Sequence, residues 1–181
     1  VLSSTNTEGT LIVHFIDVGQ GDAILIETDN YAAMIDTGDY RGDEVVPYLI
    51  EHGIEALDLA IITHPHADHI GQLDTLMYNI DVEEVWMNGH QHDTQTFERA
   101  IDAILATDAY YDEPRAGDTY ELGDALITVL HPTELSGDLN NDSIVLKIEF
   151  GEVSFLFAGD AESDAEFEMV NSGYDLSADI L

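Results

Sequence analysis

Short apolar runs, broken by Gly and Asp, fill the chain from Leu11 onward and limit its possible folds more than any other feature. They are typical of β-strands, and we predict strands at 11–18, 23–28, 31–37, 57–64, 82–87, 126–130, 143–150 and 153–160. Apolar residues at helical spacing predict helices at 43–52, 68–78 and 94–106, and a short helix from about Ser163 with Phe167 and Val170 facing inward. This order predicts an α+β fold in which two sheets pack face to face with helices outside.

The length of 181 residues suits one domain, and we expect residues 11–181 to form it. Residues 1–10 are polar and without pattern, so we expect a flexible linker there. No apolar run approaches the roughly 18 to 20 residues of a membrane-spanning helix, so we expect no stable membrane span in this chain. The chain has no cysteine, which excludes disulfides, thiolate metal sites and cysteine nucleophiles.

Acidic residues outnumber basic ones by 38 to 4, which gives a net charge of −34 with neutral histidines. The hydrophobic content of 45% excludes a disordered acidic tail, because such tails lack the apolar residues for a core. So few cations argue against nucleic-acid binding through a basic patch at ordinary ionic strength. At about 1 M salt the screening length falls to about 3 Å, and the self-repulsion is largely removed. We therefore predict a protein that works in a salt-rich environment, in the cytoplasm or outside the cell.

Four metal-ligand side chains directly follow a predicted strand, in the HxHxDH motif made by His64, His66, Asp68 and His69. In an extended segment, side chains two residues apart point the same way, so His64 and His66 can converge on one point. The turn into the next helix then presents Asp68 and His69 from another direction. Imidazole and carboxylate groups suit zinc, and also iron or manganese. The motif therefore predicts a metal site, with zinc as the first choice.

The HxHxDH motif of residues 64–69 resembles the signature of the metallo-β-lactamase superfamily, and other segments fit in the expected order. Residues 34–38 (MIDTG) resemble that superfamily's early strand-end Asp motif, and residues 157–160 (FAGD) resemble its later one. Residues 15–23 (FIDVGQGDA) and 140–146 (NNDSIVL) are similar, more narrowly, to ComEC-type competence domains. The resemblance covers nearly the whole chain and implies the αββα sandwich of that superfamily.

The resemblance implies two divalent metal ions, one held by His64 and His66, the second by Asp68 and His69, and both bridged by Asp160. Asp36 would orient the cluster through contacts with its ligands. Two such ions about 3.5 to 4 Å apart activate water and clamp the attacking and leaving oxygens of a phosphoryl or ester group. Asp68 would also steady the attacking group, so Asp36 and Asp68 are the candidate catalytic residues. The implied reaction is metal-assisted hydrolysis.

Two features depart from the superfamily's pattern. The superfamily usually has a further histidine ligand between the HxHxDH motif and the Asp that corresponds to Asp160. The only candidate for it is His131, which precedes the segment where that ligand is expected. A structural role at a strand end explains His131 as well, and Asn140, Asn141 or Asp142 could take the ligand's place. The superfamily's last histidine ligand follows the next strand, whereas the sequence ends at Leu181. We therefore expect a sandwich that is missing its C-terminal part, or else an incomplete second metal site.

Weaker candidates for substrate contact flank the motif. His90 and His92 lie between a predicted strand and a predicted helix and could line the substrate entrance, although an exposed loop explains them equally well. Gln20 could reach the rim of the site from the first hairpin, together with Asp17 and Asp22. A turn made by the neighbouring glycines explains that segment nearly as well.

The leading hypothesis is a binuclear metal-dependent hydrolase of ComEC-like type that acts on phosphodiesters, such as a nuclease linked to DNA uptake. The fold serves many reactions, so a hydrolase of another ester (a phosphorylcholine ester, a lactone or a thioester) is an alternative. Outside enzymes, the alternative is a domain that only binds metal or a partner. A histidine-containing segment after Leu181 would favour the enzyme over the binding domain.

Overall fold

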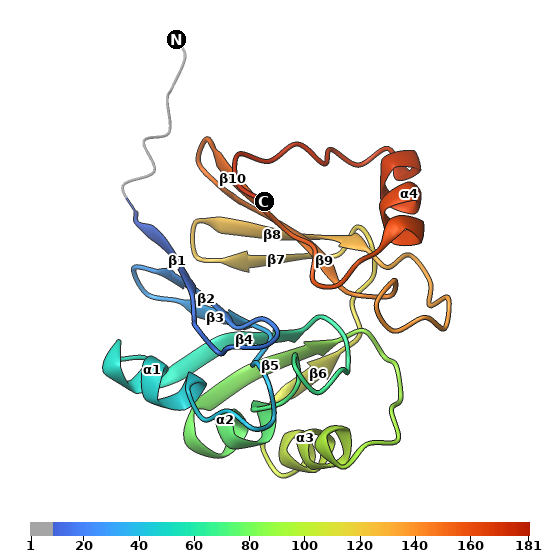
Figure 1. Cartoon of the computed structure of the whole chain (residues 1–181). Helices are drawn as coiled ribbons and strands as arrows, with labels where there is room; N and C mark the ends of the chain where they lie inside the picture. Colours follow the sequence, from blue (N-terminus) through green and yellow to red (C-terminus); the bar gives the residue numbers. More distant parts are fainter. Residues whose placement is uncertain (1–8) are drawn as a thin grey trace.

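A computed structural model describes residues 9–181, which form two β-sheets and four α-helices (Figure 1). Residues 1–8, most of the predicted linker, lie outside the described residues. The strands are β1 (Leu11–Phe15), β2 (Ile24–Thr28), β3 (Ala32–Ile35), β4 (Ala56–Ile62), β5 (Asp81–Met87), β6 (Tyr110–Asp112), β7 (Thr119–Leu122), β8 (Ala125–His131), β9 (Val145–Phe150) and β10 (Val153–Phe157). The helices are α1 (Val45–Glu51), α2 (Leu73–Asn79), α3 (Gln95–Leu105) and α4 (Ser163–Ser172). Within residues 9–181, no helix is long and apolar enough to cross a membrane.

The six-stranded sheet brings the ends of its central strands to one edge. Its order is β1-β2-β3-β4-β5-β6, with antiparallel pairing from β1 to β3 and parallel pairing from β3 to β6. Near the carboxyl ends of these strands, Ile35 of β3 pairs with Ile61 of β4, and Ile62 pairs with Met87 of β5. Because parallel strands end on the same side, the segments that follow β3, β4 and β5 meet at that edge.

The four-stranded sheet is antiparallel, in the order β10-β9-β8-β7. A hairpin turn at residues 151–152 joins β9 to β10. Along the outer side of β10, Ile180 forms a parallel bridge with Phe155, and the Leu156 N–H donates to the Ile180 carbonyl at 2.9 Å. The last residues of the chain therefore add backbone pairing to β10.

Three apolar clusters divide the molecule into four layers (Figure 1). One cluster, which includes Leu49 and Leu73, packs α1, α2 and α3 against the outer face of the six-stranded sheet. The second, which includes Ile61 and Ile127, fills the space between the sheets. The third is smaller and holds Met169 of α4 against the four-stranded sheet. The predicted α+β fold, an αββα sandwich, is confirmed.

The helix predicted at 68–78 begins later, at Leu73. The preceding carbonyl of His69 is already engaged, because it accepts hydrogen bonds from the Thr37 N–H at 2.6 Å and from the Thr37 hydroxyl at 3.0 Å. These long-range bonds replace helical ones and leave the HxHxDH motif in turns. The sequence pattern also did not predict β6 and β7, two short strands with mostly exposed residues, whose pairing is set by their neighbours.

The buried face of α4 differs from the prediction. Phe167 and Val170 were expected to face inward, but they are 73% and 71% exposed. Ala165 and Met169, four residues apart and therefore on one face of the helix, are buried instead. The prediction followed the bulkier side chains, whereas the smaller Ala165 allows α4 to lie close to the sheet.

Candidate metal centre

The HxHxDH motif lies where three strands end. β4 ends at Ile62, and residues 63–69 follow it in turns. Asp36 directly follows β3, and Asp160 lies in the turn after β10. The two sheets thus bring three separate parts of the sequence to one site at an end of the sandwich.

Asp160 is the residue on which two histidines converge. The Nε2 atom of His69 lies 3.3 Å from its Oδ1 atom, and the Nε2 atom of His64 lies 3.8 Å from its Oδ2 atom. One possible ligand atom from each of the three residues lies within 4.8 Å of the other two. Both histidines are buried, whereas the Asp160 side chain is 40% exposed. The group is therefore open to solvent on the side of Asp160.

His64 presents one nitrogen to this group because its other nitrogen is engaged. Its Nδ1 atom lies 3.1 Å from the Thr63 hydroxyl and 3.4 Å from the Ser143 hydroxyl. Its Nε2 atom faces the cluster and lies 2.9 Å from Nδ1 of His66. Burial, and then the charges of His69 and His66, lower the pKa of His64 to about 2. The His64 ring is therefore neutral, which is the form that binds a metal.

Asp36 is a buried acceptor that fixes the geometry of the site. Its carboxylate accepts hydrogen bonds from the Thr63 N–H at 2.8 Å, from the Thr63 hydroxyl at 2.7 Å and from Nδ1 of His69 at 2.8 Å. Its backbone has a φ of 55°, which Asp and Asn tolerate better than most residues. Asp36 thereby holds the His69 ring with Nε2 toward Asp160, as a residue behind a metal ligand does.

The charge of His69 is set by the carboxylates around it. Burial disfavours the charged ring, but the hydrogen bond to Asp36 and the charges of Asp36, Asp160 and Asp68 raise the pKa of His69 to about 9. The carboxylates therefore create a position that favours positive charge. That is the electrostatic requirement of a cation site.

Asp22 adds a further carboxylate beside His69. One possible ligand atom from each of Asp22, Asp36 and His69 lies within 4.8 Å of the other two. Burial, and then the charge of Asp36, raise the pKa of Asp22. The loop that carries Asp22 is tied to the loop after β3, because the Gly38 N–H donates to the Asp22 carbonyl at 2.8 Å. The sequence indicated Asp22 only as a rim residue, although the FIDVGQGDA segment was the signal that could have found it.

Asp68 lies against the loop between β1 and β2 that also carries Asp22. Its Oδ2 atom accepts a hydrogen bond from the Gln20 amide at 3.1 Å. Gly21 has a φ of 77°, and a Cβ atom at this position would collide with the Asp68 carbonyl oxygen. Only glycine allows this approach, so residues 17–22 pack directly on the motif. The structure places Gln20 at the rim of the site through this contact with Asp68.

The structure does not bring His131 to these groups. Its Nε2 atom lies 2.7 Å from the Asn141 carbonyl oxygen, and its Nδ1 atom lies 4.0 Å from Glu168 of α4. The Asn140 amide donates to Glu162 at 3.0 Å, just before α4 begins. His131, Asn140 and Asn141 thus connect the end of β8 and the following loop to α4.

Asp142 pairs with His90. The Nε2 atom of His90 lies 2.6 Å from Oδ2 of Asp142, which also accepts hydrogen bonds from the backbone N–H groups of Ser136 and Gly137, each at 2.9 Å. Burial opposes the charged form, but these hydrogen bonds lower the pKa of the Asp142 carboxyl. The pair joins the loop after β5 to the loop before β9, because the Asp142 carboxylate accepts hydrogen bonds from residues of both loops.

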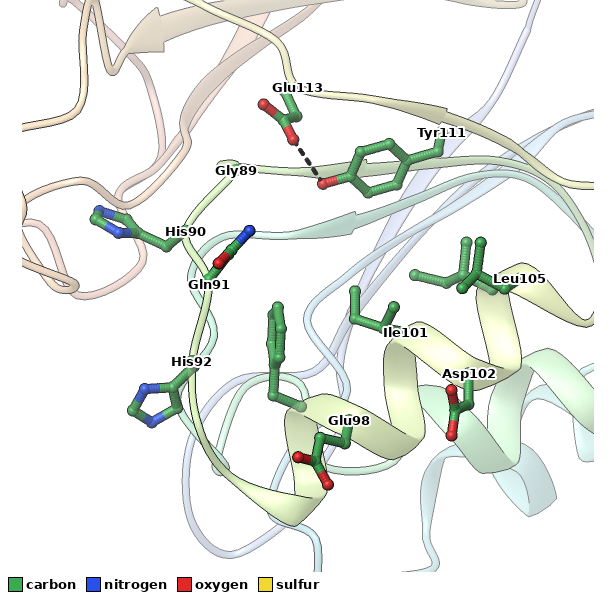
Figure 2. Close-up of a pocket in the computed structure, with 12 residues that line it drawn as sticks. Gly89, His90, Gln91, His92, Glu98, Ile101, Asp102, Leu105, Tyr111 and Glu113 are labelled. Atoms are coloured by element: carbon green, nitrogen blue, oxygen red, sulfur yellow. Dashed lines mark hydrogen bonds between the residues drawn. The ribbon is translucent and has the colours of Figure 1, made fainter.

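His92 comes from the same loop as His90 but lies beside the motif. The centres of the His92 and His66 rings are 6.0 Å apart. Figure 2 shows this loop passing along a hollow over α3, with His90 and His92 on its other side. Of the two candidate entrance histidines, His92 is therefore the one in contact with the motif.

Sequence reasoning did not single out the two hydroxyls beside His64. Thr63 and Ser143 face Nδ1 of His64 from different segments, which are joined by the Ile144 N–H donating to the Thr63 carbonyl at 2.9 Å. The only signal is position: Thr63 immediately precedes the motif, and Ser143 immediately follows the NND segment. Their proximity depends on how the two sheets pack, which the sequence pattern does not specify.

The sequence model of a protein family, the metallo-beta-lactamase superfamily, matches residues 16–180, and this range includes all the groups described above. The chain belongs to the metallo-β-lactamase superfamily. Among solved structures, Igni18, described as a novel metallo hydrolase from the hyperthermophilic archaeon Ignicoccus hospitalis, is similar with a TM-score of 0.58. The likeness covers 91% of this chain and 66% of that one at 17% identity, and it shows the shared fold.

Two curated relatives of this superfamily member match along most of its length. ComE operon protein 3 of Bacillus subtilis is 29% identical over 189 residues, covering 93% of this chain and 24% of that protein. Recombination protein 2 of Haemophilus influenzae is 27% identical over 164 residues, covering 85% of this chain and 19% of that protein. The chain thus spans about a quarter or less of these relatives' length. They confirm the predicted resemblance to ComEC-like competence proteins.

The metallo-β-lactamase fold implies divalent metal ions, and the residues present fit them. A neutral His64, a His69 held by Asp36, and the Asp160 carboxylate converge within 4.8 Å, with nitrogen and oxygen donors that suit zinc, iron or manganese. The chain therefore has the metal-dependent hydrolase fold of its superfamily, with a group of possible metal ligands at one end of the sandwich.

Proposed function

We propose that this superfamily member uses two divalent metal ions, zinc as the first choice, to hydrolyse phosphodiester bonds of nucleic acid. The convergence of His64, His69 and Asp160 carries the proposal. Following the superfamily pattern, the ligands would be His64 and His66 for one ion, Asp68 and His69 for the other, and Asp160 between them. When bound, the ions would supply an activated water and stabilise the charge on the leaving oxygen.

The chain's own residues would keep these ligands in place. Asp36 holds Nδ1 of His69, so the ring cannot turn its Nε2 atom away from Asp160. Gln20 donates to the Oδ2 atom of Asp68, and this hydrogen bond does not involve the Oδ1 atom of the same carboxylate. We assign Asp36 and Asp68 roles in positioning and in steadying the attacking group, as the sequence indicated.

The names of the relatives support a nucleic-acid substrate, because one belongs to a competence operon and the other is a recombination protein. The net charge of −34 opposes contact with a polyanion at low ionic strength. At about 1 M salt the screening length of about 3 Å confines that repulsion to close neighbours. The bound cations would then be the main attraction for a phosphate. We therefore expect nucleic acid to be cut best at high salt, opposite to the usual salt dependence.

Measuring the metal content tests the proposal that the chain binds two divalent ions. The whole chain, saturated with zinc or manganese in molar KCl and freed of excess metal, should hold about two ions per molecule. The double variant His66→Ala/Asp68→Ala should retain fewer ions and lose hydrolysis of bis(p-nitrophenyl) phosphate. His52→Ala is the matched control, because His52 is an exposed histidine at the end of α1 that contacts Tyr48. Unchanged metal content and turnover in the double variant would remove the motif from the mechanism.

A panel of substrates tests the proposal that the chain hydrolyses phosphodiester bonds of nucleic acid. Single-stranded DNA, a phosphorylcholine ester, a lactone and a thioester are compared at molar salt with the metal-loaded chain. Cleavage of DNA that His66→Ala/Asp68→Ala abolishes supports the proposal. Cleavage of only the non-phosphate esters would assign a different substrate, and metal binding without any cleavage would assign a binding domain.

A further inference from the structure

A hollow of about 650 Å³ lies next to the candidate metal centre, between α3 and the loop after β5 (Figure 2). Its size is within the range of small-molecule pockets, about 300 to 1,000 Å³. Neither the two groups of possible metal ligands nor the contacts that orient them include its apolar walls. It is therefore a separate feature that borders the site.

The walls of the hollow are apolar and aromatic. Ile101 and Leu105 of α3 lie across from Tyr111 of β6 in Figure 2, and Phe97 of α3 lines the same space. Leu105 is 77% exposed and Tyr111 is 44% exposed, so this apolar surface has no cover among the described residues. Two aromatic rings beside aliphatic side chains form a surface on which a flat ring can stack.

Tyr111 is held in place by Glu113. The Tyr111 hydroxyl donates to Oε1 of Glu113 at 3.0 Å, as the dashed line in Figure 2 shows. Burial, and then the Glu113 charge, raise the pKa of the Tyr111 phenol, so the ring stays neutral. Gly89 has a φ of 89°, and a Cβ atom there would lie 2.5 Å from the Glu113 carboxylate, so glycine allows Glu113 to pack against the loop. The aromatic wall is therefore preformed.

The charges around the hollow are of one sign. Glu98, Asp102 and Glu113 line it, and within residues 9–181 no lysine or arginine does. The carboxylates of Glu98 and Asp102 lie at the edge of the hollow, on the side of α3 away from Tyr111 (Figure 2). An anionic group would be repelled here, whereas a neutral ring with N–H donors could reach the Glu113 carboxylate. Among nucleic-acid components, the bases fit this description and the phosphates do not. Carboxylates are the usual partners of the cytosine amino group.

One loop separates the hollow from the motif. Residues 90–92 of this loop line the hollow, but the His90 and His92 rings point to its other side (Figure 2), where the centre of the His92 ring lies 6.0 Å from that of His66. A nucleotide with its phosphate at the motif would therefore pass around this loop to place its base toward α3. The separation of an acidic, aromatic hollow from a cation-favouring group matches the division of a nucleotide into base and phosphate.

We propose that this hollow binds the base of a nucleotide next to the bond that is cut, and that it favours bases with an exocyclic amino group over thymine. This inference rests on the proposed function for its biological meaning. The hollow, however, needs no metal to bind a base, and binding can be measured on nucleosides, which carry no phosphate.

The experiment measures binding of deoxycytidine and thymidine by NMR titration to the whole chain in molar KCl, with metals removed by a chelator. Deoxycytidine should bind about fivefold or more tightly than thymidine. Tyr111→Ala should weaken deoxycytidine binding about fivefold or more, as expected for the loss of one stacking partner. Tyr111→Phe, which keeps the ring, should bind within about twofold of the wild type.

Two further variants separate binding from folding. Leu105→Asp changes a side chain that is 77% exposed, so the fold has little to lose, and it should weaken binding as Tyr111→Ala does. Tyr110→Ala is the matched control, because Tyr110 is the preceding residue of the same strand, is 72% exposed and does not line the hollow. Equal loss in Tyr110→Ala and Tyr111→Ala, or no binding of either nucleoside, overturns the proposal.

Cleavage assays on the metal-loaded chain distinguish this inference from the proposed function. Tyr111→Ala should slow cleavage of a cytosine-containing single strand more than cleavage of an abasic strand. If wild type cuts both strands and Tyr111→Ala slows them equally, the base site is wrong and the proposed function stands. If nucleosides bind as expected but no phosphodiester is cut, the proposed function is wrong and the base site stands.

Discussion

Asp36 carries more of the site's geometry than any of the proposed ligands. It is fully buried, and its two carboxylate oxygens accept three hydrogen bonds, two from Thr63 and one from His69. In Asp36→Asn, one acceptor oxygen becomes an NH₂ donor, so at least one of these buried donors loses its partner. We expect a loss of about 1 to 3 kcal/mol in the free energy of unfolding, and a fall of about 10- to 100-fold in zinc affinity.

Urea denaturation and a zinc competition titration measure the two effects of Asp36→Asn. Asn tolerates the positive φ of residue 36, so backbone strain does not confuse the result. Asp81→Asn, at the exposed first residue of β5, is the control for loss of one acidic charge. If both variants lower zinc affinity equally, the effect is one of overall charge, and Asp36 does not position His69.

The two buried histidines titrate in opposite directions, which predicts how the metal-free protein responds to pH. The pKa of His69 is raised from 6.5 to about 9, so its contribution to stability is complete below pH 6.5 and is lost as the pH rises toward 9. The pKa of His64 is lowered from 6.5 to about 2, so its contribution is complete above pH 6.5 and is lost as the pH falls. With a chelator present, the free energy of unfolding should therefore be highest near pH 6.5.

Urea denaturation between about pH 5 and pH 9 at fixed molar salt tests this pH dependence. His69→Gln, which keeps a polar side chain but does not titrate, should remove the decline on the alkaline side. A stability that rises steadily up to pH 9 in the wild type would show that His69 is not held as a cation by Asp36.

At the scale of the elements, α4 shows how little of its apolar surface is buried. Met169 lies in the third apolar cluster, whereas Phe167 is 73% exposed. Met169→Ala should lower the free energy of unfolding by about 2 kcal/mol or more, because a buried side chain is removed. Phe167→Ala should change it by less than about 0.5 kcal/mol. Thermal or urea denaturation of the pair compares them directly, and a larger loss in Phe167→Ala than in Met169→Ala would mean that α4 buries the face predicted from the sequence.

The sequence identified those elements and residues whose signal is local. The strand runs and the HxHxDH motif are contiguous patterns, and Asp36 and Asp160 each stand directly after a strand. Strand order alone therefore brings these residues together. The start of α2 was misplaced because Thr37, far away in sequence, takes the His69 carbonyl. The face of α4 was misjudged because shape, more than hydrophobicity, decides how close a helix lies to a sheet.

Contacts between loops could not be predicted, because they join residues that are far apart in the sequence. The pairing of His90 with Asp142 joins residues that are 52 positions apart and shows no periodic pattern. Ser143 reaches His64 across the two sheets, 79 positions away. Such contacts depend on the packing of complete layers. The sequence could therefore name Asp142 and His90 as candidates but not as partners of each other.

At the scale of the whole molecule, few ion pairs offset the repulsion between the acidic side chains. Of the four cationic side chains, Arg41 and Arg99 each pair with one aspartate, and the buried Lys147 donates to Asp175. These ion pairs leave the net charge at −34. Pairs at the surface contribute at most about 1 kcal/mol each. We therefore expect the folded chain to depend on salt in the solvent to screen its acidic surface.

Salt should accordingly stabilise this protein. We expect the free energy of unfolding, measured by urea denaturation, to rise as KCl increases from about 0.1 M to about 1 M, since the screening length falls from about 10 Å to about 3 Å over that range. A variant with four exposed glutamates replaced by lysine gains two charge units at each position, which moves the net charge from −34 to −26. The free energy of unfolding of this variant should depend less on the KCl concentration than that of the wild type. The four glutamates are Glu51, Glu55, Glu83 and Glu121.

The matched control replaces the same four glutamates by aspartate, which keeps the net charge at −34 and should keep the full salt dependence. If the aspartate and lysine variants respond to KCl alike, the effect comes from stronger apolar burial in salt and not from charge. If the lysine variant alone loses the dependence, the acidic surface is what adapts the fold to salt. The same variant then shows whether that surface also limits access of nucleic acid, because its cleavage of DNA should extend to lower salt than that of the wild type.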